Sequence, residues 1–176
     1  DLPPEILEKT GRHATAAPAA APPLVSGAAA RSPEALDSFE DGPDLAQVRA
    51  SLTPAEVARR PRGLWRWHEM LPVCDPYFRF SLGEGDSPLL ALPRLGAQVG
   101  VPRLFVKDES GQPTGSFKAR GMAVAVSRAV ELGVKEFVVP TAGNAGGALA
   151  AYAARAGVPA HIYMPQDAPQ VNQVEV

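Results

Sequence analysis

A lysine and a side-chain amide occupy the two points in this sequence where a strand-like run leads into a helix-like one. Lys118 ends the run Pro-Thr-Gly-Ser-Phe-Lys, and Asn144 lies within Thr-Ala-Gly-Asn-Ala-Gly-Gly, which begins at Thr141. Ligands of open α/β sheets bind where the carboxyl ends of strands meet the amino ends of helices. One turn supplies an amine and the other supplies backbone N–H groups. Together they predict amine chemistry on an anionic substrate, and hence an enzyme.

Lys118 has the position of an amine that reacts as a nucleophile. It lies in the first turn of its predicted helix, where the positive end of the helix dipole disfavours a second positive charge, and burial in a crevice acts in the same direction. Both effects favour the neutral amine, which is the form that attacks an aldehyde. A lysine in a first helical turn is more commonly a solvated surface group, so this motif gains its meaning only from the second turn.

The second turn is suited to an anion. Ala145, Gly146 and Gly147 leave the first helical N–H groups unshielded by side chains, which allows a carboxylate or phosphate to approach them closely. Two plainer interpretations stay open: Asn144 as the N-cap of its helix, and the glycines as packing positions against the sheet. We expect Lys118 and Asn144 to face one pocket because both turns would lie at the same end of adjacent parallel strands.

The composition is that of an ordinary globular protein. The chain has 176 residues, of which 45% are hydrophobic and 20% charged, and this is enough for one domain with a buried core. A net charge of -2 argues against nucleic acid or an anionic membrane as the main partner, since either favours a basic surface. No apolar run is long enough to cross a bilayer.

Cysteine and histidine are used sparingly. Cys74 is the single cysteine, which excludes an internal disulfide and fits a reducing compartment, and we interpret it as a small, partly buried thiol. His13, His68 and His161 show no spacing typical of metal ligands, so we expect no metal site. The amino terminus lacks the basic start and apolar stretch of a secretory signal, and we therefore predict a cytoplasmic protein.

Two segments precede the alternating part of the chain. Residues 1–43 are dominated by Ala, Pro, Gly and Ser and are predicted to form a flexible leader. Residues 44–82 are predicted to form a helical segment that wraps around a larger body, with apolar residues at helical spacing and a proline-led helix start after Thr53. The two tryptophans within residues 63–72 are expected to pack against that body rather than to form a ligand-binding aromatic box.

Strand and helix alternate regularly in residues 83–176. Gly133 and Gly157 follow the two predicted helices as C-terminal caps. Alternating strands and helices with short connections predict an α/β fold, in which helices flank a parallel sheet with right-handed crossovers. The β-rich runs and the helix-like stretches lie, in chain order, at 103–107, 116–132, 137–139, 144–156 and 160–164.

The two turns resemble those of the pyridoxal-phosphate enzymes of the tryptophan synthase β-subunit class, which share fold type II, and of threonine synthases in particular. The resembling residues are Pro-Thr-Gly-Ser-Phe-Lys-Ala-Arg-Gly-Met at 113–122 and the turn at 141–147. The segments at 63–72 and 83–89 are similar to entry segments of threonine synthases. Serine and threonine dehydratases share the lysine turn but are less similar there. The likeness covers residues 43–176, as the first, smaller α/β part of such an enzyme.

The resemblance implies a role for each residue of the two turns. Lys118 is the implied catalytic residue, which forms a Schiff base with pyridoxal 5'-phosphate and later moves a proton. Phe117 is implied to lie against the cofactor ring, and Asn144 to hydrogen-bond its phenolic oxygen. The implied binding site for the substrate carboxylate consists of Thr141, through its hydroxyl, and of the turn formed by Thr141, Ala142, Gly143, Asn144 and Ala145.

For threonine synthase the implied reaction converts O-phosphohomoserine and water to threonine and phosphate, which is a carbon–oxygen lyase reaction. The cofactor is the electron sink while phosphate leaves Cγ and water adds at Cβ, and the protein supplies orientation. The implied partner is a small amino-acid substrate, and the family tendency is a homodimer. Two alternatives stay open. One is a serine/threonine dehydratase or diaminopropionate ammonia-lyase of the same superfamily, and the other is a non-catalytic anion-binding module.

Three departures from the family pattern limit what this chain is expected to do. The leader stands where many relatives have a cysteine-rich, zinc-ribbon-like segment, and Ala119 stands where many have an acidic residue. The glycine-rich loop that grips the cofactor phosphate, and the residue that faces the pyridine nitrogen, are expected beyond Val176. We therefore expect a fragment with part of the active site, inactive alone. Salt bridging, without a catalytic role, is expected of Lys107, Asp108, Glu109 and Arg120.

Overall fold

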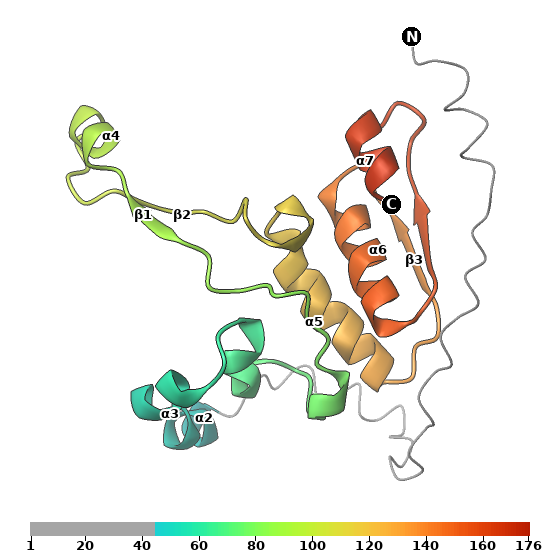
Figure 1. Cartoon of the computed structure of the whole chain (residues 1–176), viewed down its shortest axis with the longest axis horizontal. Coiled ribbons are helices and arrows are strands. Elements are labelled where there is room, and N and C mark those ends of the chain that lie inside the picture. The colour runs from blue at the N-terminus through green and yellow to red at the C-terminus, as the bar shows by residue number, and fades with distance from the viewer. Residues whose placement is uncertain (1–44) are drawn as a thin grey trace.

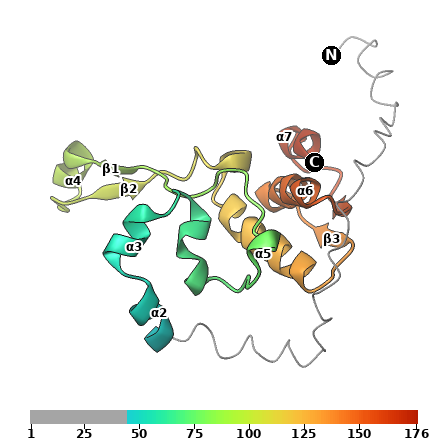
Figure 2. The same cartoon turned by 60° about the horizontal axis from the view of Figure 1, so that its bottom comes forward.

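The computed structural model describes residues 45–176, which are drawn in colour in Figures 1 and 2. The leader predicted for residues 1–43 lies outside this part of the chain. The helices and strands are, in chain order, α2 (Leu45–Ser51), α3 (Pro54–Arg59), the 3-10 helices η2 (Leu64–Met70) and η3 (Pro76–Phe78), β1 (Leu89–Ala91), α4 (Pro93–Gln98), β2 (Phe105–Lys107), the 3-10 helix η4 (Pro113–Gly115), α5 (Lys118–Glu131), β3 (Phe137–Pro140), α6 (Asn144–Ala156), β4 (Ala160–Tyr163) and α7 (Gln170–Glu175).

The helix start predicted after Thr53 is confirmed. The Thr53 side chain accepts a hydrogen bond of 3.2 Å from the backbone N–H of Glu56, and Pro54 occupies the first turn of α3. This arrangement is favourable because the capping oxygen satisfies one free N–H of the first turn, while proline has no N–H to leave unpaired. Among the described residues, no helix has both the length and the apolar character needed to cross a bilayer.

The segment between α3 and β1 is fastened to α5. Oε1 of Glu131 accepts hydrogen bonds from the backbone N–H groups of Cys74 (3.0 Å) and Asp75 (2.7 Å), and Oγ of Ser127 accepts one from the N–H of Phe80 (3.1 Å). Cys74 is exposed, and this corrects the expectation of a partly buried thiol. The correction has a simple cause, because the backbone at this turn faces Glu131 and the short thiol side chain is left in solvent.

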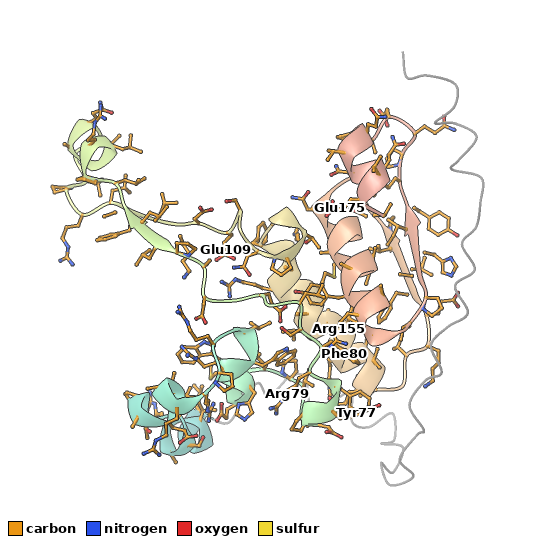
Figure 3. The ribbon with its side chains drawn as sticks, in the orientation of Figure 1. Tyr77, Arg79, Phe80, Glu109, Arg155 and Glu175 are labelled. Atoms are coloured by element: carbon orange, nitrogen blue, oxygen red, sulfur yellow. The ribbon has the colours of Figure 1, made fainter. Side chains whose placement is uncertain are left out.

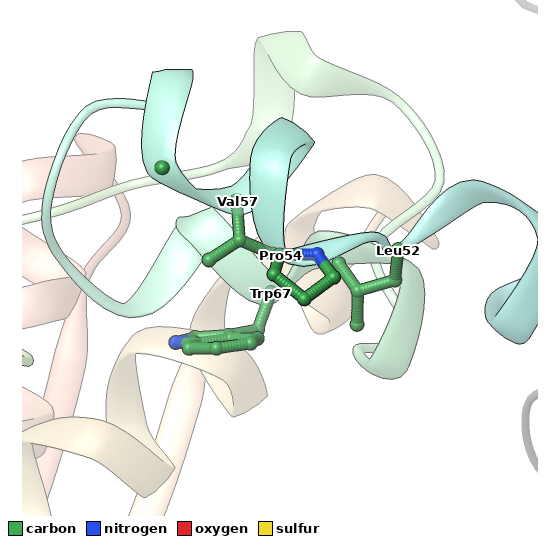
Figure 4. A pocket seen from close by; sticks show the side chains of 5 residues that line it. Leu52, Pro54, Val57 and Trp67 are labelled. Carbon is green, nitrogen blue, oxygen red and sulfur yellow. The ribbon is translucent and has the colours of Figure 1, made fainter.

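The two tryptophans have different surroundings. Nε1 of Trp65 donates a hydrogen bond of 2.8 Å to the carbonyl oxygen of Phe80, so Trp65 packs against the body as expected. Trp67 is 43% exposed. It lines an apolar hollow, shown in Figure 4, whose other lining residues are Leu52, Pro54, Val57 and Ala58. These four residues carry no polar side-chain atom that would orient a ligand.

The strand β2 belongs to an arm rather than to the parallel sheet. It pairs antiparallel with β1, with Leu89 opposite Lys107 and Ala91 opposite Phe105, and α4 lies in the connection. Figures 1 and 2 show that this arm extends away from the rest of the described chain. The expectation that the run at 103–107 joins the parallel sheet is therefore wrong. The three-residue strand β1 lies nearby in sequence, and such a hairpin closes at a small cost in loop entropy.

The strands β3 and β4 pair in parallel and are joined by α6, which confirms the predicted α/β fold with a parallel sheet. Phe137 lies opposite Ala160, and Val139 lies opposite Ile162. These four side chains form the inner face of the sheet, because they pack against the buried core. On the outer face Tyr163 is 65% exposed.

The core lies between α5 and α6, which pack side by side. Both helices match their predicted extents within two residues, and Gly157 ends α6 in the left-handed conformation with φ 71°. Small residues dominate the contact, which lets the two helices approach closely. The fully or nearly fully buried members of the core are Ala119, Ala123, Val126, Leu149 and Tyr152.

Candidate functional site

The turn that carries Lys118 is built from two successive left-handed residues. Thr114 has φ 60° and Gly115 has φ 62°, within η4 and directly before the extended residue Ser116. Oγ of Ser116 accepts a hydrogen bond of 3.3 Å from the backbone N–H of Lys118. Lys118 is the first residue of α5, which confirms its predicted place in the first turn of the helix, and its side chain leaves the helix at the positive end of the helix dipole.

The amine of Lys118 is accessible. Its Nζ lies 4.8 Å from the centroid of the Phe117 ring, which is itself 59% exposed. Within residues 45–176, no hydrogen bond or ion pair is formed by Nζ. The described residues thus leave Lys118 exposed, whereas the sequence predicts an amine desolvated in a crevice. The amine beside the aromatic face of Phe117 is thus open to a carbonyl compound that reaches it from solvent, and it can attack in its neutral form.

The second turn leads from β3 into α6. The backbone N–H of Thr141 donates to the carbonyl oxygen of Tyr163 (2.9 Å), and Oγ1 of Thr141 accepts a hydrogen bond from the N–H of Gly143 (3.3 Å). Gly143 is the N-cap of α6 and Asn144 is its first residue. The interpretation of Asn144 as the N-cap is therefore wrong. Its amide is exposed at the amino end of the helix.

The packing interpretation of the glycines is supported by their surroundings. A Cβ atom at Gly146 would lie 2.8 Å from Cγ2 of Thr141 and 3.0 Å from Cγ2 of Ile162. A Cβ atom at Gly147 would overlap the carboxylate of Glu175, which Figure 3 shows beside α6. Both glycines are buried. Because these glycines have no side chain, the sheet and α7 can pack against the first turn of α6. An anion that approaches this turn would therefore contact Asn144 and the residues before it, rather than the two glycines.

A residue that sequence reasoning missed also touches this turn. Nδ2 of Asn172, on α7, donates a hydrogen bond of 2.9 Å to the carbonyl oxygen of Ala142. Asn172 belongs to no recognisable sequence motif, and it lies 30 residues from Ala142 in the chain. This hydrogen bond fixes the peptide group between Ala142 and Gly143, at the centre of the predicted carboxylate-binding turn.

The helix pair brings the two turns together. η4 contacts α6, and α5 and α6 lie side by side. Figure 1 shows that both helices begin at the same end of the pair. Lys118 and Asn144 therefore lie at one end of the packed helices. The sequence predicts that the two turns meet because they follow adjacent parallel strands. That reason is wrong, because the strand before the lysine turn is the antiparallel strand β2, which is not a neighbour of β3. The contact between helices takes the place of the contact between strands.

The comparisons with known proteins show the family of this chain. A family model described as "Pyridoxal-phosphate dependent enzyme" matches residues 80–175, which include both turns. The chain belongs to this family. Threonine synthase from Methanocaldococcus jannaschii is 40% identical over 123 residues, which are 70% of this chain and 30% of that protein. Threonine synthase from Synechocystis sp. is 42% identical over 114 residues, which are 64% of this chain and 30% of that protein.

The chain spans about 30% of the length of these two relatives of the pyridoxal-phosphate dependent enzyme family. A crystal structure of diaminopropionate ammonia lyase from Escherichia coli is also similar. It has 30% sequence identity and a TM-score of 0.48, and the match covers 54% of this chain and 28% of that chain.

Pyridoxal 5'-phosphate is the cofactor of this family, and the lysine turn fits its aldehyde group. Lys118 offers an amine with no competing polar partner among the described residues, and Phe117 offers an exposed aromatic face next to it. A pyridine ring stacks well on such a face. Lys118 therefore fits the aldehyde group of the cofactor, and Phe117 fits its ring.

Proposed function

We propose that this chain contributes the lysine-bearing part of a threonine synthase-like lyase that acts on O-phosphohomoserine. The observation that carries the proposal is the 40% identity to a threonine synthase over 123 residues, together with an unpaired Lys118 amine at the same end of the helix pair as Asn144. The dehydratase and ammonia-lyase alternatives of the same family would also use Lys118, so this residue does not distinguish between the reactions. A homodimer and a cytoplasmic location stay predictions.

The cofactor, when bound, supplies an electron sink for the carbon atoms of the substrate. Within that reaction Lys118 would hold the cofactor through its Nζ and would move a proton with the same atom. Phe117 would support the cofactor ring, and the Asn144 amide would orient the ring by donating a hydrogen bond to it. All three residues lie at the amino ends of α5 and α6, and this position supports the proposed roles.

The turn from Thr141 to Ala145 would bind the α-carboxylate of the substrate. The Thr141 hydroxyl accepts one hydrogen bond from within the turn and keeps its own proton to donate. The backbone N–H groups at the start of α6 and the positive end of the helix dipole add further stabilisation for an anion. The hydrogen bond from Asn172 to Ala142 holds the turn in place.

Reductive trapping tests the role of Lys118. The protein is incubated with pyridoxal phosphate, reduced with borohydride and digested, and the modified lysine is identified by mass spectrometry. We expect the adduct on Lys118 in preference to Lys9, Lys107 and Lys135. The Lys118→Arg variant should lose it, while Lys135→Arg serves as a matched control because it removes an exposed lysine outside the turn. An adduct spread evenly over all lysines would refute the proposal.

A second measurement separates the enzyme alternatives. Phosphate release from O-phosphohomoserine by the complete protein is compared with ammonia release from serine, threonine and diaminopropionate. Phosphate release alone is expected for the threonine synthase-like reaction, and ammonia release would assign the chain to the dehydratase or ammonia-lyase alternative.

The non-catalytic anion-binding module is a second candidate, and the exposure of Lys118 favours it. In that case Lys118 adds only charge beside the Asn144 turn. This candidate predicts no preferential labelling of Lys118 over the other lysines, and it predicts that Lys118→Arg binds a carboxylate as well as the parent protein does. The trapping experiment therefore decides between the two candidates.

A further inference from the structure

The loop that carries Lys118 is tied to a segment that lies far from it in sequence. Gln112 is 6% exposed, and its side chain pairs with both polar groups of Gly85. Its Oε1 accepts a hydrogen bond from the Gly85 N–H (2.9 Å), and its Nε2 donates one to the Gly85 carbonyl oxygen (3.2 Å). Two parallel hydrogen bonds between planar amide groups fix orientation as well as distance. The start of the lysine loop is thereby held against the segment Gly85–Ser87.

An ion pair between Arg120 and Glu109, with the hydroxyl of Ser87, connects the two ends of the same loop. Nε of Arg120 donates to Oε2 of Glu109 (2.7 Å), and an Arg120 terminal nitrogen donates to Oε1 (3.0 Å), which is a bidentate ion pair. The same nitrogen donates to Oγ of Ser87 (3.1 Å), and the Ser87 hydroxyl donates to Glu109. Figure 3 shows Glu109 close to the start of α5. The expected salt bridging is confirmed for Glu109 and Arg120, which pair with each other. Within residues 45–176 it is not found for the other two residues, because Lys107 donates to the carbonyl oxygen of Ser87 and Asp108 accepts hydrogen bonds from Ser110.

The charge state of this cluster is well defined. The Arg120 guanidinium, followed by the Ser87 hydroxyl, hydrogen-bonds the Glu109 carboxylate and holds its pKa below the usual range. The same ion pair raises the pKa of Arg120. Both groups are therefore charged at neutral pH, and the pair is only partly exposed, so solvent screens it less than a surface pair.

The loop between these ties has a conformation that needs support. Thr114 adopts φ 60°, which costs a β-branched residue about 1–2 kcal/mol. Its Oγ1 is buried and has no hydrogen-bond partner among the described residues. A conformation of this kind persists only where the surroundings hold it. Glu109 precedes the strained turn and Arg120 follows Lys118 by two residues, so their ion pair closes the loop across the turn.

We propose that Ser87, Glu109, Gln112 and Arg120 are positioning residues, which hold the strained lysine turn so that the Lys118 amine is presented to an aldehyde. The inference deepens the proposed function and rests on the role given there to Lys118. None of the four residues needs to touch the reacting atoms. Their effect is transmitted through the backbone of residues 109–120.

The test compares two lysines in one molecule. The full chain is trapped with pyridoxal phosphate and borohydride for short times, and the initial labelling rates of Lys118 and Lys135 are measured by mass spectrometry. The ratio of the two rates reports the local presentation of Lys118. A residue with only a general role in stability would lower the unfolding midpoint without changing this ratio, because both lysines are read in the folded population.

We expect Glu109→Gln and Arg120→Lys to lower the ratio about tenfold, since a misplacement of about 1 Å at a reacting group costs up to ~100-fold. Ser87→Ala is a milder variant that should lower the ratio and fold even where the charge variants do not. Combining Glu109→Arg with Arg120→Glu should recover part of the loss. Glu69→Gln is the matched control, because it removes a carboxylate that pairs with Arg60 (2.7 Å) in the segment before β1, which contains neither of the two lysines.

The outcomes are distinct. Suppose that the parent chain labels Lys118 preferentially. If Glu109→Gln, Arg120→Lys, Ser87→Ala and the double variant all keep the labelling ratio of the parent chain, the inference is overturned while the proposed function stands. If the parent chain shows no preference for Lys118, the proposed function fails and the inference fails with it. A fall in the ratio for Glu69→Gln of the same size would also overturn the inference, because the effect would then not belong to the loop.

Discussion

The hydroxyl of Tyr152 donates a hydrogen bond of 2.5 Å to Oε2 of Glu84, and both side chains are fully buried. The backbone N–H of Leu82 donates to the same oxygen (2.9 Å), whereas Oε1 has no partner among the described residues. The carbonyl oxygen of Glu84 accepts a hydrogen bond from Leu64 (2.9 Å). Glu84 therefore joins α6, its own turn and the start of η2 at a single buried point.

Tyr152→Phe should destabilise the protein by about 1.5–3 kcal/mol, since it removes a hydrogen bond to a charged or strongly polar acceptor that has no access to water. The measurement is the free energy of unfolding in urea. The change removes one oxygen atom and keeps the ring, so packing in the core is preserved. An unchanged unfolding midpoint would contradict the pairing of Tyr152 with Glu84.

Tyr152 should resist ionisation in the folded protein. Burial, reinforced by the Glu84 carboxylate, raises the pKa of Tyr152 well above its ordinary value near 10. The folded state thus keeps a proton that the unfolded state loses, so stability is fully present below about pH 10 and falls as the pH rises further. The check is an absorbance titration of tyrosinate, in which Tyr152→Phe should match the parent protein up to the pH at which the parent unfolds.

Substitution of the helix glycines should have opposite effects at two positions. Gly146→Ala places a Cβ atom 2.8 Å from Thr141 and 3.0 Å from Ile162, so overpacking should outweigh the gain in helix propensity and destabilise the protein by about 1–2 kcal/mol. Gly121→Ala in α5 meets open space and should stabilise it by about 0.5–1 kcal/mol. Thermal unfolding of both variants decides the matter, and equal shifts in one direction would be the contrary result.

Acid should weaken the helical segment before β1. The Arg60 guanidinium, which forms a bidentate hydrogen bond with the carboxylate, lowers the pKa of Glu69 to about 2. A depressed pKa in the folded state contributes stability above the unfolded value near 4.3, and this contribution is lost as the pH falls toward 2. Glu69→Gln should therefore show a flatter loss of stability between pH 5 and pH 2. A parallel loss in both proteins would show that the pair does not contribute.

Local patterns in the sequence predicted much of this fold. The cap at Thr53, the apolar spacing of α5 and the left-handed glycine after α6 are each read within a few residues, and all three are found in the structure. The predicted position of Lys118 at the start of a helix holds for the same reason. The assignment of each residue to a catalytic or binding role stays a prediction.

Contacts between distant segments were not predictable in this way. The pairing of Gln112 with Gly85 joins residues 27 apart, and that of Asn172 with Ala142 joins residues 30 apart, without any repeating pattern. The antiparallel partner of β2 was missed because a three-residue strand is too short to show alternation. The exposure of Lys118 was missed because a crevice depends on what surrounds the turn, which its own sequence does not encode.

The β1–α4–β2 arm has a consequence for the handling of the protein in solution. Within residues 45–176 no further strand pairs with the outer edges of its two strands, and Leu89, Leu90, Phe105 and Val106 are exposed on them. Two strands without a covering layer are marginally stable in water, and bare strand edges pair readily with other chains. The apparent molecular mass of the polypeptide from light scattering should therefore rise with concentration, and a charged residue in place of Leu90 should suppress that self-association.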